Sequence, residues 1–313
     1  MSARHVLVLG GSGFVGRHLA AALDARGYRV TILSRNRERH RELQVLPRVR
    51  IVNGDPYDGA CLAQHLAGMD LAINLVGILN EPGSSGAGFQ RAHVELTATL
   101  LAAMKQAGVP RLVQMSALNA GQGESHYLRT RGEAEALVRA SGLRWSIVQS
   151  SVIFGRGDGL FCRFADLLGL MPVLPLARPN ARFAPVHVGD VAEALARVAD
   201  DPHAAGKTFQ LYGPETCTLI EIVRMTRDTL GLRRLVVPLP DGLGYLQAWS
   251  GEWLPGKPIS RDNFRSLKLD SVGTEDGLKT LGIAAARIGP LLPRVLGANP
   301  HQRSLDLARA RRD

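Results

Sequence analysis

Residues 5–27 read HVLVLGGSGFVGRHLAAALDARG. The apolar run Val6–Leu9 has the length of one buried strand. A glycine-rich turn follows, and apolar residues then recur at helical spacing until Gly27, where we expect the helix to end. A strand, a glycine turn and a helix in this order are typical of the corner where a dinucleotide-binding fold holds a pyrophosphate.

The glycine turn supplies the first set of candidate cofactor-binding residues. Its glycines have the spacing G-x-x-G-x-x-G, which lets the backbone turn tightly and approach the phosphates. The free N–H groups of the following helix then face the anion. We therefore predict that the cofactor contacts Gly10, Ser12, Gly13, Phe14, Val15 and Gly16. A plain strand-to-helix turn is the alternative interpretation.

The composition limits the classes of protein that fit. The chain has 313 residues, of which 45% are hydrophobic, and this is enough for a sizeable core. Its three cysteines are far apart and indicate neither a disulfide framework nor a metal site. No apolar run approaches the ~20 residues of a membrane span. Because the first strand starts early in the sequence, we expect no targeting peptide. The net charge of +10 fits an anionic ligand or membrane surface. Because no nucleic-acid-binding motif is present, we expect no nucleic-acid partner.

Strand-like runs alternate with helical segments up to about residue 155. This alternation predicts an α/β fold with a doubly wound parallel sheet. After the first strand, the expected strands are 28–34, 49–53, 70–76, 111–117 and 144–150.

The end of the second expected strand bears on the choice of cofactor. Many NAD-binding folds have an acid here that binds the ribose 2′-OH, but this chain has Ser34 and Arg35. Arginine forms paired, charge-assisted hydrogen bonds with a phosphate. Ser34 and Arg35 therefore predict NADP(H) in preference to NAD(H), which stays possible. A solvated basic loop is the alternative.

Further candidates follow the third and fourth strands. Asp55 either binds the adenine amino group or organises the turn before Pro56. Leu75, Val76 and Gly77 end the fourth strand, where a small residue lets the strand end lie near the cofactor.

The second half of the chain is less regular. A strand running into a helix is expected at 185–195, with Asp190 and Glu193 at the spacing of a capping box. Thr218 and Glu221 have the same spacing and predict a second capped helix near 218–230. Asp58 is a candidate cap for a short helix in the first half.

We expect two domains. The dinucleotide-binding domain covers 1–155, and 185–215 returns to it with a further strand at 207–213. A small C-terminal domain that binds a substrate or partner is built from 156–184 and 216–313.

Residues 236–258 are apolar and contain Tyr245, Trp249 and Trp253. Aromatic residues at this density usually form the core of a small domain. The alternative is a patch that faces lipid or quinone. The basic end of the chain, ARARRD, is expected to be solvated or attracted to a membrane.

Motifs along nearly the whole chain resemble the extended short-chain dehydrogenase/reductase superfamily, the NAD-dependent epimerase/dehydratase group. These motifs are GGSGFVG, GDPYD, INLVGIL, YLRTRGEAE, PVHVGDVA and FQLYGPE. INLVGIL (73–79), QMSALNA (114–120) and SRDNFRSL (260–267) are similar to the nucleotide-binding accessory subunit of respiratory complex I and its bacterial relatives.

The resemblance also implies the site residues. Active members of the superfamily use a Ser/Thr, a Tyr and a Lys, which bind substrate and nicotinamide ribose. Tyr127 matches the acid/base tyrosine, and Arg131 occupies the lysine position. The hydroxyl position falls near Leu118, with Ser116 earlier on the same turn. Arginine keeps the positive charge, but it does not give up a proton. The superfamily's Arg-Pro after the sixth strand is Gln149-Ser150 here.

The dinucleotide-binding residues thus match the superfamily pattern, whereas the catalytic residues match it only in part. We expect an NAD(P)(H)-binding protein of the complex I accessory-subunit type, with its cofactor held mainly structurally. Its expected partner, besides the dinucleotide, is a quinone or a respiratory-chain complex. Its expected location is cytoplasmic, with a peripheral position on the inner face of the respiratory membrane. One alternative is an active NAD(P)H-dependent reductase or sugar-nucleotide epimerase/dehydratase that uses Tyr127. Another is a binding module that senses the NADP(H) redox ratio.

Overall fold

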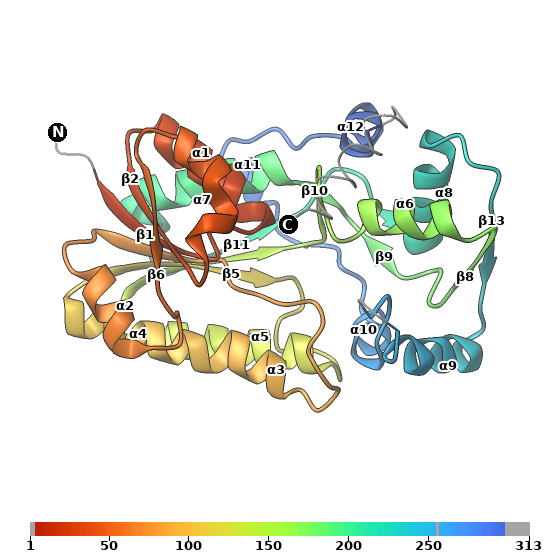
Figure 1. Cartoon of the computed structure of the whole chain (residues 1–313), viewed down its shortest axis with the longest axis horizontal. Helices are drawn as coiled ribbons and strands as arrows, with labels where there is room; N and C mark the ends of the chain where they lie inside the picture. The colour runs from red at the N-terminus through yellow and green to blue at the C-terminus, as the bar shows by residue number, and fades with distance from the viewer. Residues whose placement is uncertain (1–3, 255–256, 298–313) are drawn as a thin grey trace.

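A parallel sheet forms the centre of the computed structural model, which describes residues 4–254 and 257–297 (Figure 1). Within these residues, seven parallel strands pair in the order β11–β6–β5–β4–β1–β2–β3. The strands are β1 (His5–Leu9), β2 (Arg29–Ser34), β3 (Val49–Asn53), β4 (Leu71–Asn74), β5 (Arg111–Ala117), β6 (Arg144–Ser150) and β11 (Lys207–Leu211). The doubly wound α/β fold expected from the sequence is confirmed.

Helices cover both faces of this sheet (Figure 1). Because side chains alternate along a strand, Val6 and Val8 of β1 pack on one face, and Leu7 and Leu9 pack on the other. The first face carries α1 (Phe14–Ala25) and α7 (Val188–Asp200), and the second carries α2 (Gly59–Leu66), α4 (Leu96–Ala107) and α5 (His126–Arg139).

The chain reverses its direction of winding between β1 and β4. Strands β2 and β3 lie on one side of β1, whereas β4, β5 and β6 lie on the other. In open α/β sheets, ligands bind in the crevice outside the carboxyl ends of the strands at such a reversal. The ends of β1 and β4 meet there, because Leu9 and Asn74 are register partners.

The helical segment that leads into α4 contains an irregular turn. A short helix, α3 (Ala87–Phe89), leads into a π-helical segment (Gln90–Glu95) and only then into α4. Such π-turns occur frequently at functional sites. Here the turn carries His93, which is buried.

The remaining elements build a smaller, less regular region at the right of Figure 1. Three short strand pairs belong to it: β8 with β13 in parallel, β9 with β12 antiparallel, and β7 with β10 in parallel. The domain boundaries expected from the sequence stay a prediction, although β11 does lie in the central sheet. The elements are β7 (Ile153–Phe154), α6 (Phe161–Leu170), β8 (Val173–Leu176), β9 (Arg182–Phe183), β10 (Val186–His187), β12 (Cys217–Thr218), α8 (Leu219–Thr229), β13 (Leu235–Pro238), α9 (Asp241–Gly251), α10 (Arg261–Ser266) and α12 (Ile288–Val295). The short helix α11 (Gly277–Thr280) instead packs beside β11 of the central sheet. Two 3₁₀ segments, Arg37–Val45 and Pro202–Ala204, complete the described secondary structure.

Two of the three predicted helix caps are confirmed. Asp58 caps α2, and Thr218 forms a full capping box with Glu221 at α8. The capping box expected at Asp190 is wrong, because the side chain of His187 accepts from the N–H of Gly189 and caps α7.

The two side chains of that expected box bind elsewhere. The carboxylate of Asp190 accepts from the N–H of Ala286 (2.8 Å). Glu193 pairs with Arg26 (2.6 Å) and Arg197 (2.7 Å). Long-range partners therefore override the local spacing.

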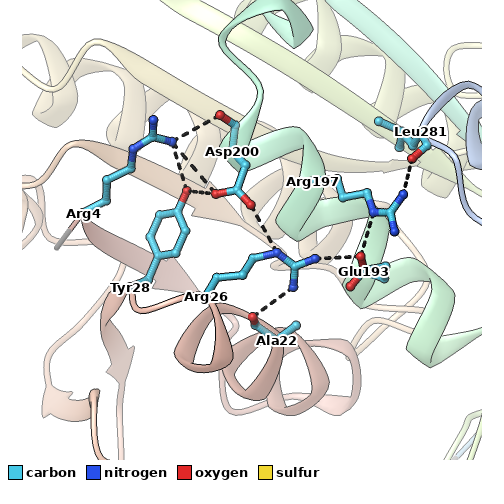
Figure 2. A network of polar contacts seen from close by, with 8 residues as sticks. All are labelled: Arg4, Ala22, Arg26, Tyr28, Glu193, Arg197, Asp200 and Leu281. Carbon is cyan, nitrogen blue, oxygen red and sulfur yellow. Dashed lines mark hydrogen bonds and ion pairs between the residues drawn. The ribbon is translucent and has the colours of Figure 1, made fainter. Parts of the chain in front are cut away.

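Figure 2 shows the polar network to which Glu193 belongs. The Tyr28 hydroxyl donates to Asp200 (2.6 Å), and Arg26 joins Asp200 (3.2 Å) to Glu193. Arg197 extends the network to the carbonyl of Leu281 (2.6 Å). Burial raises the pKa of Tyr28 to about 12, and the hydrogen bond to Asp200 adds to the shift. The network joins the turn between α1 and β2 to α7, and α7 to the carbonyl of Leu281.

The aromatic residues of 236–258 do not form a core, and that expectation is wrong. Trp249 and Trp253 are 47% and 79% exposed, and Tyr245 is also exposed. They lie on and just after α9, whose core contribution is made by small residues such as Ala248. Within the described residues, no helix has the length and apolarity needed to cross a bilayer. The basic end ARARRD lies outside the described residues.

Candidate functional site

The glycine turn between β1 and α1 forms a tight backbone cradle. Gly10 has a φ of +73°, which favours glycine, and its carbonyl accepts from the N–H of Gly13 (3.0 Å). A Cβ on Gly16 would collide with the backbone of Gly10 and Gly11. Gly13 caps α1 without a side-chain acceptor, so the first N–H groups of the helix are left for an anion.

Two arginines at the end of β2 are free to bind a ligand. Arg35 and Arg39 line a cavity that begins at the glycine turn, and neither makes a hydrogen bond or ion pair with any residue the structure describes. Their neighbours Arg37 and Arg41 both pair with Glu38 and do not line the cavity. Ser34 also lines the cavity.

Asp55 lies outside this lining. It is exposed, and its carboxylate accepts from the N–H of Tyr57 (3.0 Å), which organises the turn. Pro56 and Tyr57 line the cavity at this position instead. The predicted contact of Asp55 with adenine stays a prediction.

Arg131 fills the space beside the end of β4. Its guanidinium Nη1 donates to the carbonyls of Met115 (3.1 Å) and Val76 (3.3 Å). A Cβ on Gly77 would overlap the guanidinium, so the small residue expected at this position makes room for Arg131 rather than only for a cofactor. Leu75, Val76 and Gly77 all line the cavity.

Tyr127 and Ser116 line the same cavity from two elements. Tyr127 is the second residue of α5, one turn before Arg131, whose Cζ lies 5.6 Å from the centre of the tyrosine ring. Ser116 lies on β5, and its buried hydroxyl has no hydrogen-bond partner among the described residues. Leu118, at the position of the superfamily's hydroxyl, is buried and lines the cavity with an apolar side chain.

Gln149, at the superfamily's arginine position, points away from the cavity. Its amide donates to the carboxylate of Glu135 (2.9 Å) on α5. Its neighbours Ser150 and Ser151 line the cavity instead.

Asp262 of α10 positions Tyr127 and was missed by the sequence analysis. Its carboxylate accepts from the N–H groups of His126 (2.6 Å) and Tyr127 (3.1 Å), while Ser125 caps the same helix end. Asp262 is buried. The sequence signal for Asp262 was the motif SRDNFRSL, which contributes to the resemblance but had no role assigned to it.

His93 was also missed, and it packs against the ring of Tyr127 with 5.6 Å between ring centres. The N–H of Ile78 donates to Nε2 (3.4 Å), so Nδ1 carries the proton and donates to the Thr130 hydroxyl (2.9 Å). Burial lowers the pKa of His93 to about 2, and the nearby Arg131 charge adds to the shift. His93 is therefore a neutral support for Tyr127 rather than a proton donor.

The cavity that joins these residues has a volume of about 1530 Å³. It runs from Arg35 and the glycine turn, past Ser116 and Tyr127, into the smaller region of the molecule. Small-molecule pockets usually measure roughly 300–1,000 Å³. This cavity therefore offers room beyond that of a single ordinary ligand.

A family model described as NAD(P)H-binding matches residues 10–159. This match covers the glycine cradle, both free arginines, Tyr127 and Arg131. Residues 10–159 therefore resemble an NAD(P)H-binding domain.

Curated relatives that match most of this chain include respiratory-chain subunits and a reductase. The 40 kDa subunit of NADH-ubiquinone oxidoreductase from Neurospora crassa is 28% identical over 74% of this chain and 62% of its own length. Subunit 9 of the 1 alpha subcomplex of mitochondrial NADH dehydrogenase (ubiquinone) from Mus musculus is 28% identical over 88% of this chain and 75% of its own. A ceramide reductase from Caulobacter vibrioides is 28% identical over 75% of this chain and 74% of its own.

Solved structures show the same fold around an NAD(P)H-binding domain. The dTDP-glucose 4,6-dehydratase DesIV from Streptomyces venezuelae, with NAD bound, superposes with a TM-score of 0.75 at 23% identity over 96% of this chain and 98% of its own. The resemblance to the complex I accessory subunit is confirmed, and the solved structure confirms the fold of the epimerase/dehydratase type of short-chain dehydrogenase/reductase.

Proposed function

We propose that this protein holds NADPH mainly as a structural cofactor, in a respiratory role of the complex I accessory-subunit type. The observation that carries the proposal is the contrast between the two ends of the nucleotide site. The glycine cradle is complete, and Arg35 and Arg39, which line the same cavity, have no side-chain partner among the residues that the structure describes. At the reacting end, Arg131 stands where active relatives need lysine, and its guanidinium is bound to backbone carbonyls.

The chemistry of arginine supports the structural role. An arginine does not deprotonate at working pH, and its planar fork is suited to fixed hydrogen bonds. A tyrosine needs a neighbouring group that assists its deprotonation before it serves as a base at neutral pH. Arg131 supplies charge next to Tyr127 but no proton relay, and Leu118 supplies no hydroxyl.

Native mass spectrometry of the purified protein tests this proposal. We expect one NADP(H) per chain, retained through gel filtration. We also expect no oxidation of that NADPH on addition of a short-chain ubiquinone or a ketone. A purified protein that carries no nucleotide, and binds none by calorimetry, would refute the proposal.

We further propose peripheral attachment to an anionic respiratory membrane through α9. Tyr245 and Trp249 lie on this helix, and Trp253 follows it directly. Tyr and Trp are the residues that settle at membrane interfaces, where the ring is apolar and one end is polar. The net charge of +10 adds attraction to anionic lipid. Flotation with vesicles tests this: binding should require anionic lipid and should fall at high salt.

A reductase is the second candidate, because one observation favours it. The buried Ser116 hydroxyl has no hydrogen-bond partner among the described residues, and Ser116 lines the cavity that Tyr127 also lines, as expected for a group that donates to a substrate oxygen. NADPH supplies a hydride when bound. Tyr127 would then deliver the proton to the substrate oxygen, Ser116 would orient that oxygen, and Arg131 would stabilise negative charge. The Caulobacter vibrioides relative, named as a ceramide reductase, adds weight.

A further inference from the structure

The cavity continues beyond the nucleotide residues into an arm whose lining is apolar. This apolar arm is formed by α6, β8, β9, α8, α9, α10 and the segments next to them. Its apolar lining residues are Leu160, Phe164, Leu167, Met171, Leu174, Leu176, Phe183, Leu219, Ile259, Leu267 and Leu269. From this lining we infer that the arm binds the hydrocarbon chain of a membrane lipid. The inference rests on the proposed function, in which NADPH binds at the other end of the cavity. It adds a second ligand, which binds in the apolar arm.

The polar side chains that line the apolar arm are already bonded within the protein. Gln247 accepts from the N–H of Ala177 (3.2 Å) and donates to the carbonyl of Pro175 (2.8 Å). Asn263 donates to the carbonyl of Leu79 (3.1 Å) and accepts from the N–H of Ser260 (3.1 Å). The hydroxyls of the two lining serines on α9 and α10 bond to carbonyls of their own helices.

One charged side chain lines the described part of the apolar arm, and it is Arg163. Its guanidinium donates to the carbonyl of Lys257, and burial lowers its pKa. A sugar nucleotide carries a diphosphate, which needs several free cations or N–H groups. The arm lacks such a set, so its chemistry does not suit the substrates of sugar-nucleotide enzymes. An uncharged hydrocarbon chain needs only apolar contact.

The mouth of the apolar arm lies at an apolar surface. Leu79, Leu170 and Leu254 line the cavity and are also 58%, 81% and 55% exposed. Leu254 directly follows Trp253, so the mouth continues into the exposed aromatic residues of α9. On β8, Val173 points outward while Leu174 and Leu176 point into the arm.

These exposed side chains gather at one end of the molecule. Of the 12 large exposed hydrophobic residues in the described chain, ten fall between residues 170 and 254. They belong to α9, to the β8–β13 pair and to the residues next to them, at the right of Figure 1. An apolar surface that borders an apolar cavity fits a ligand drawn from a bilayer, because the chain never crosses open water.

Fluorescence binding tests this inference on the full protein loaded with NADPH. The probe is dansyl-labelled undecanoic acid, whose emission rises when the chain enters an apolar site. We expect saturable binding of one probe per protein. Oleic acid and a short-chain ubiquinone serve as competitors, and they separate an acyl chain from an isoprenoid chain as the natural occupant. Displacement by either one supports the inference, and displacement by UDP-glucose overturns it.

Substitutions that fill the arm give the second readout. Met171→Trp and Leu167→Trp place an indole in the arm and should weaken probe binding at least tenfold. Val45→Trp is the matched control, because Val45 is 80% exposed and does not line the cavity. Equal probe affinity in Met171→Trp and the control would overturn the inference. Should both variants unfold, the competition data on the unmodified protein decide it.

Calorimetry with NADPH on the same samples keeps the two proposals distinguishable. We expect both indole variants to bind NADPH with unchanged affinity, because neither position borders the glycine turn. If the unmodified protein binds the probe but not NADPH, the proposed function fails and the lipid site stands. If it binds NADPH but no probe, the lipid site fails and the proposed function stands.

Discussion

Replacement of Arg35 by alanine should remove much of a preference for NADPH over NADH. Arg35 lines the cavity at the end of β2 without any partner among the described residues. The 2′-phosphate is the group that distinguishes the two cofactors at this position. An unpaired guanidinium beside it should form charge-assisted hydrogen bonds that NADH does not make.

The magnitude follows from the exposure of Arg35 and from its neighbour. A hydrogen bond to a charged group contributes about 1.5–3 kcal/mol. Arg35 is exposed, so solvent screening favours the lower end, and Arg39 keeps part of the phosphate site. We therefore expect Arg35→Ala to weaken NADPH binding by about 1.5 kcal/mol, roughly tenfold. The double variant with Arg39→Ala should lose about twice this free energy.

Calorimetric titration with NADPH and NADH is the assay, and the chain offers a close control. Arg37 pairs with Glu38 (2.9 Å) and does not line the cavity, so Arg37→Ala should leave both affinities within about twofold. NADH binding should be nearly unchanged in all three variants. Equal affinity of the unmodified protein for the two cofactors would refute the reasoning. An equal loss in Arg37→Ala would show that general charge, not a phosphate contact, is responsible.

Three further predictions concern stability and chemistry. Because the folded pKa of His93 is lowered to about 2 from 6.5, the unfolded state binds a proton first as the pH falls. The free energy of unfolding of the unmodified protein should therefore drop, relative to that of His93→Gln, by about 1.4 kcal/mol per pH unit between pH 6 and 4. Urea titration at each pH measures this, and an equal pH dependence of the two proteins contradicts it. The folded pKa of Tyr28 is raised to about 12 from 10, so its contribution is present below pH 10 and is lost as the pH rises through 12. Tyr28→Phe should cost about 1.5–3 kcal/mol at pH 8, and this difference should shrink by about 1.4 kcal/mol between pH 9 and 11. Tyr127→Phe should leave NADPH affinity nearly unchanged; if the unmodified protein turns over NADPH and this variant loses 10²–10⁴-fold in rate, the reductase candidate replaces the structural one.

The nucleotide half could be predicted from the sequence because its determinants are local. Strands β3, β5 and β6 have the bounds expected from runs of apolar residues. The glycine turn is likewise local, since Gly10, Gly13 and Gly16 lie within seven residues of chain. The capping box of α8 is a third local signal.

The features that were wrong or missed depend on partners far along the chain. Asp190 has the local spacing of a cap, but its carboxylate binds the backbone of Ala286. Asp262 lies more than a hundred residues from Tyr127, whose helix it holds. The aromatic residues of α9 have the composition of a core, and only the packing shows that no described element covers them. The apolar arm is assembled from several elements that are separate in the sequence, so no single stretch of sequence predicts it.

We propose that Arg131 accounts for the contrast between a complete dinucleotide-binding site and an incomplete set of catalytic residues. A lysine carries a single compact ammonium, whereas the guanidinium fork of Arg131 reaches the carbonyls of both Val76 and Met115. These carbonyls belong to the segments after β4 and along β5, so Arg131 joins two strands at the crevice where the cofactor lies. Gly77 has no room for a Cβ beside the guanidinium, and each residue therefore constrains the other. We propose that arginine in place of the superfamily's lysine gives up a proton relay and gains a bridge that fixes the cavity wall, which would favour retention of a bound cofactor over its turnover.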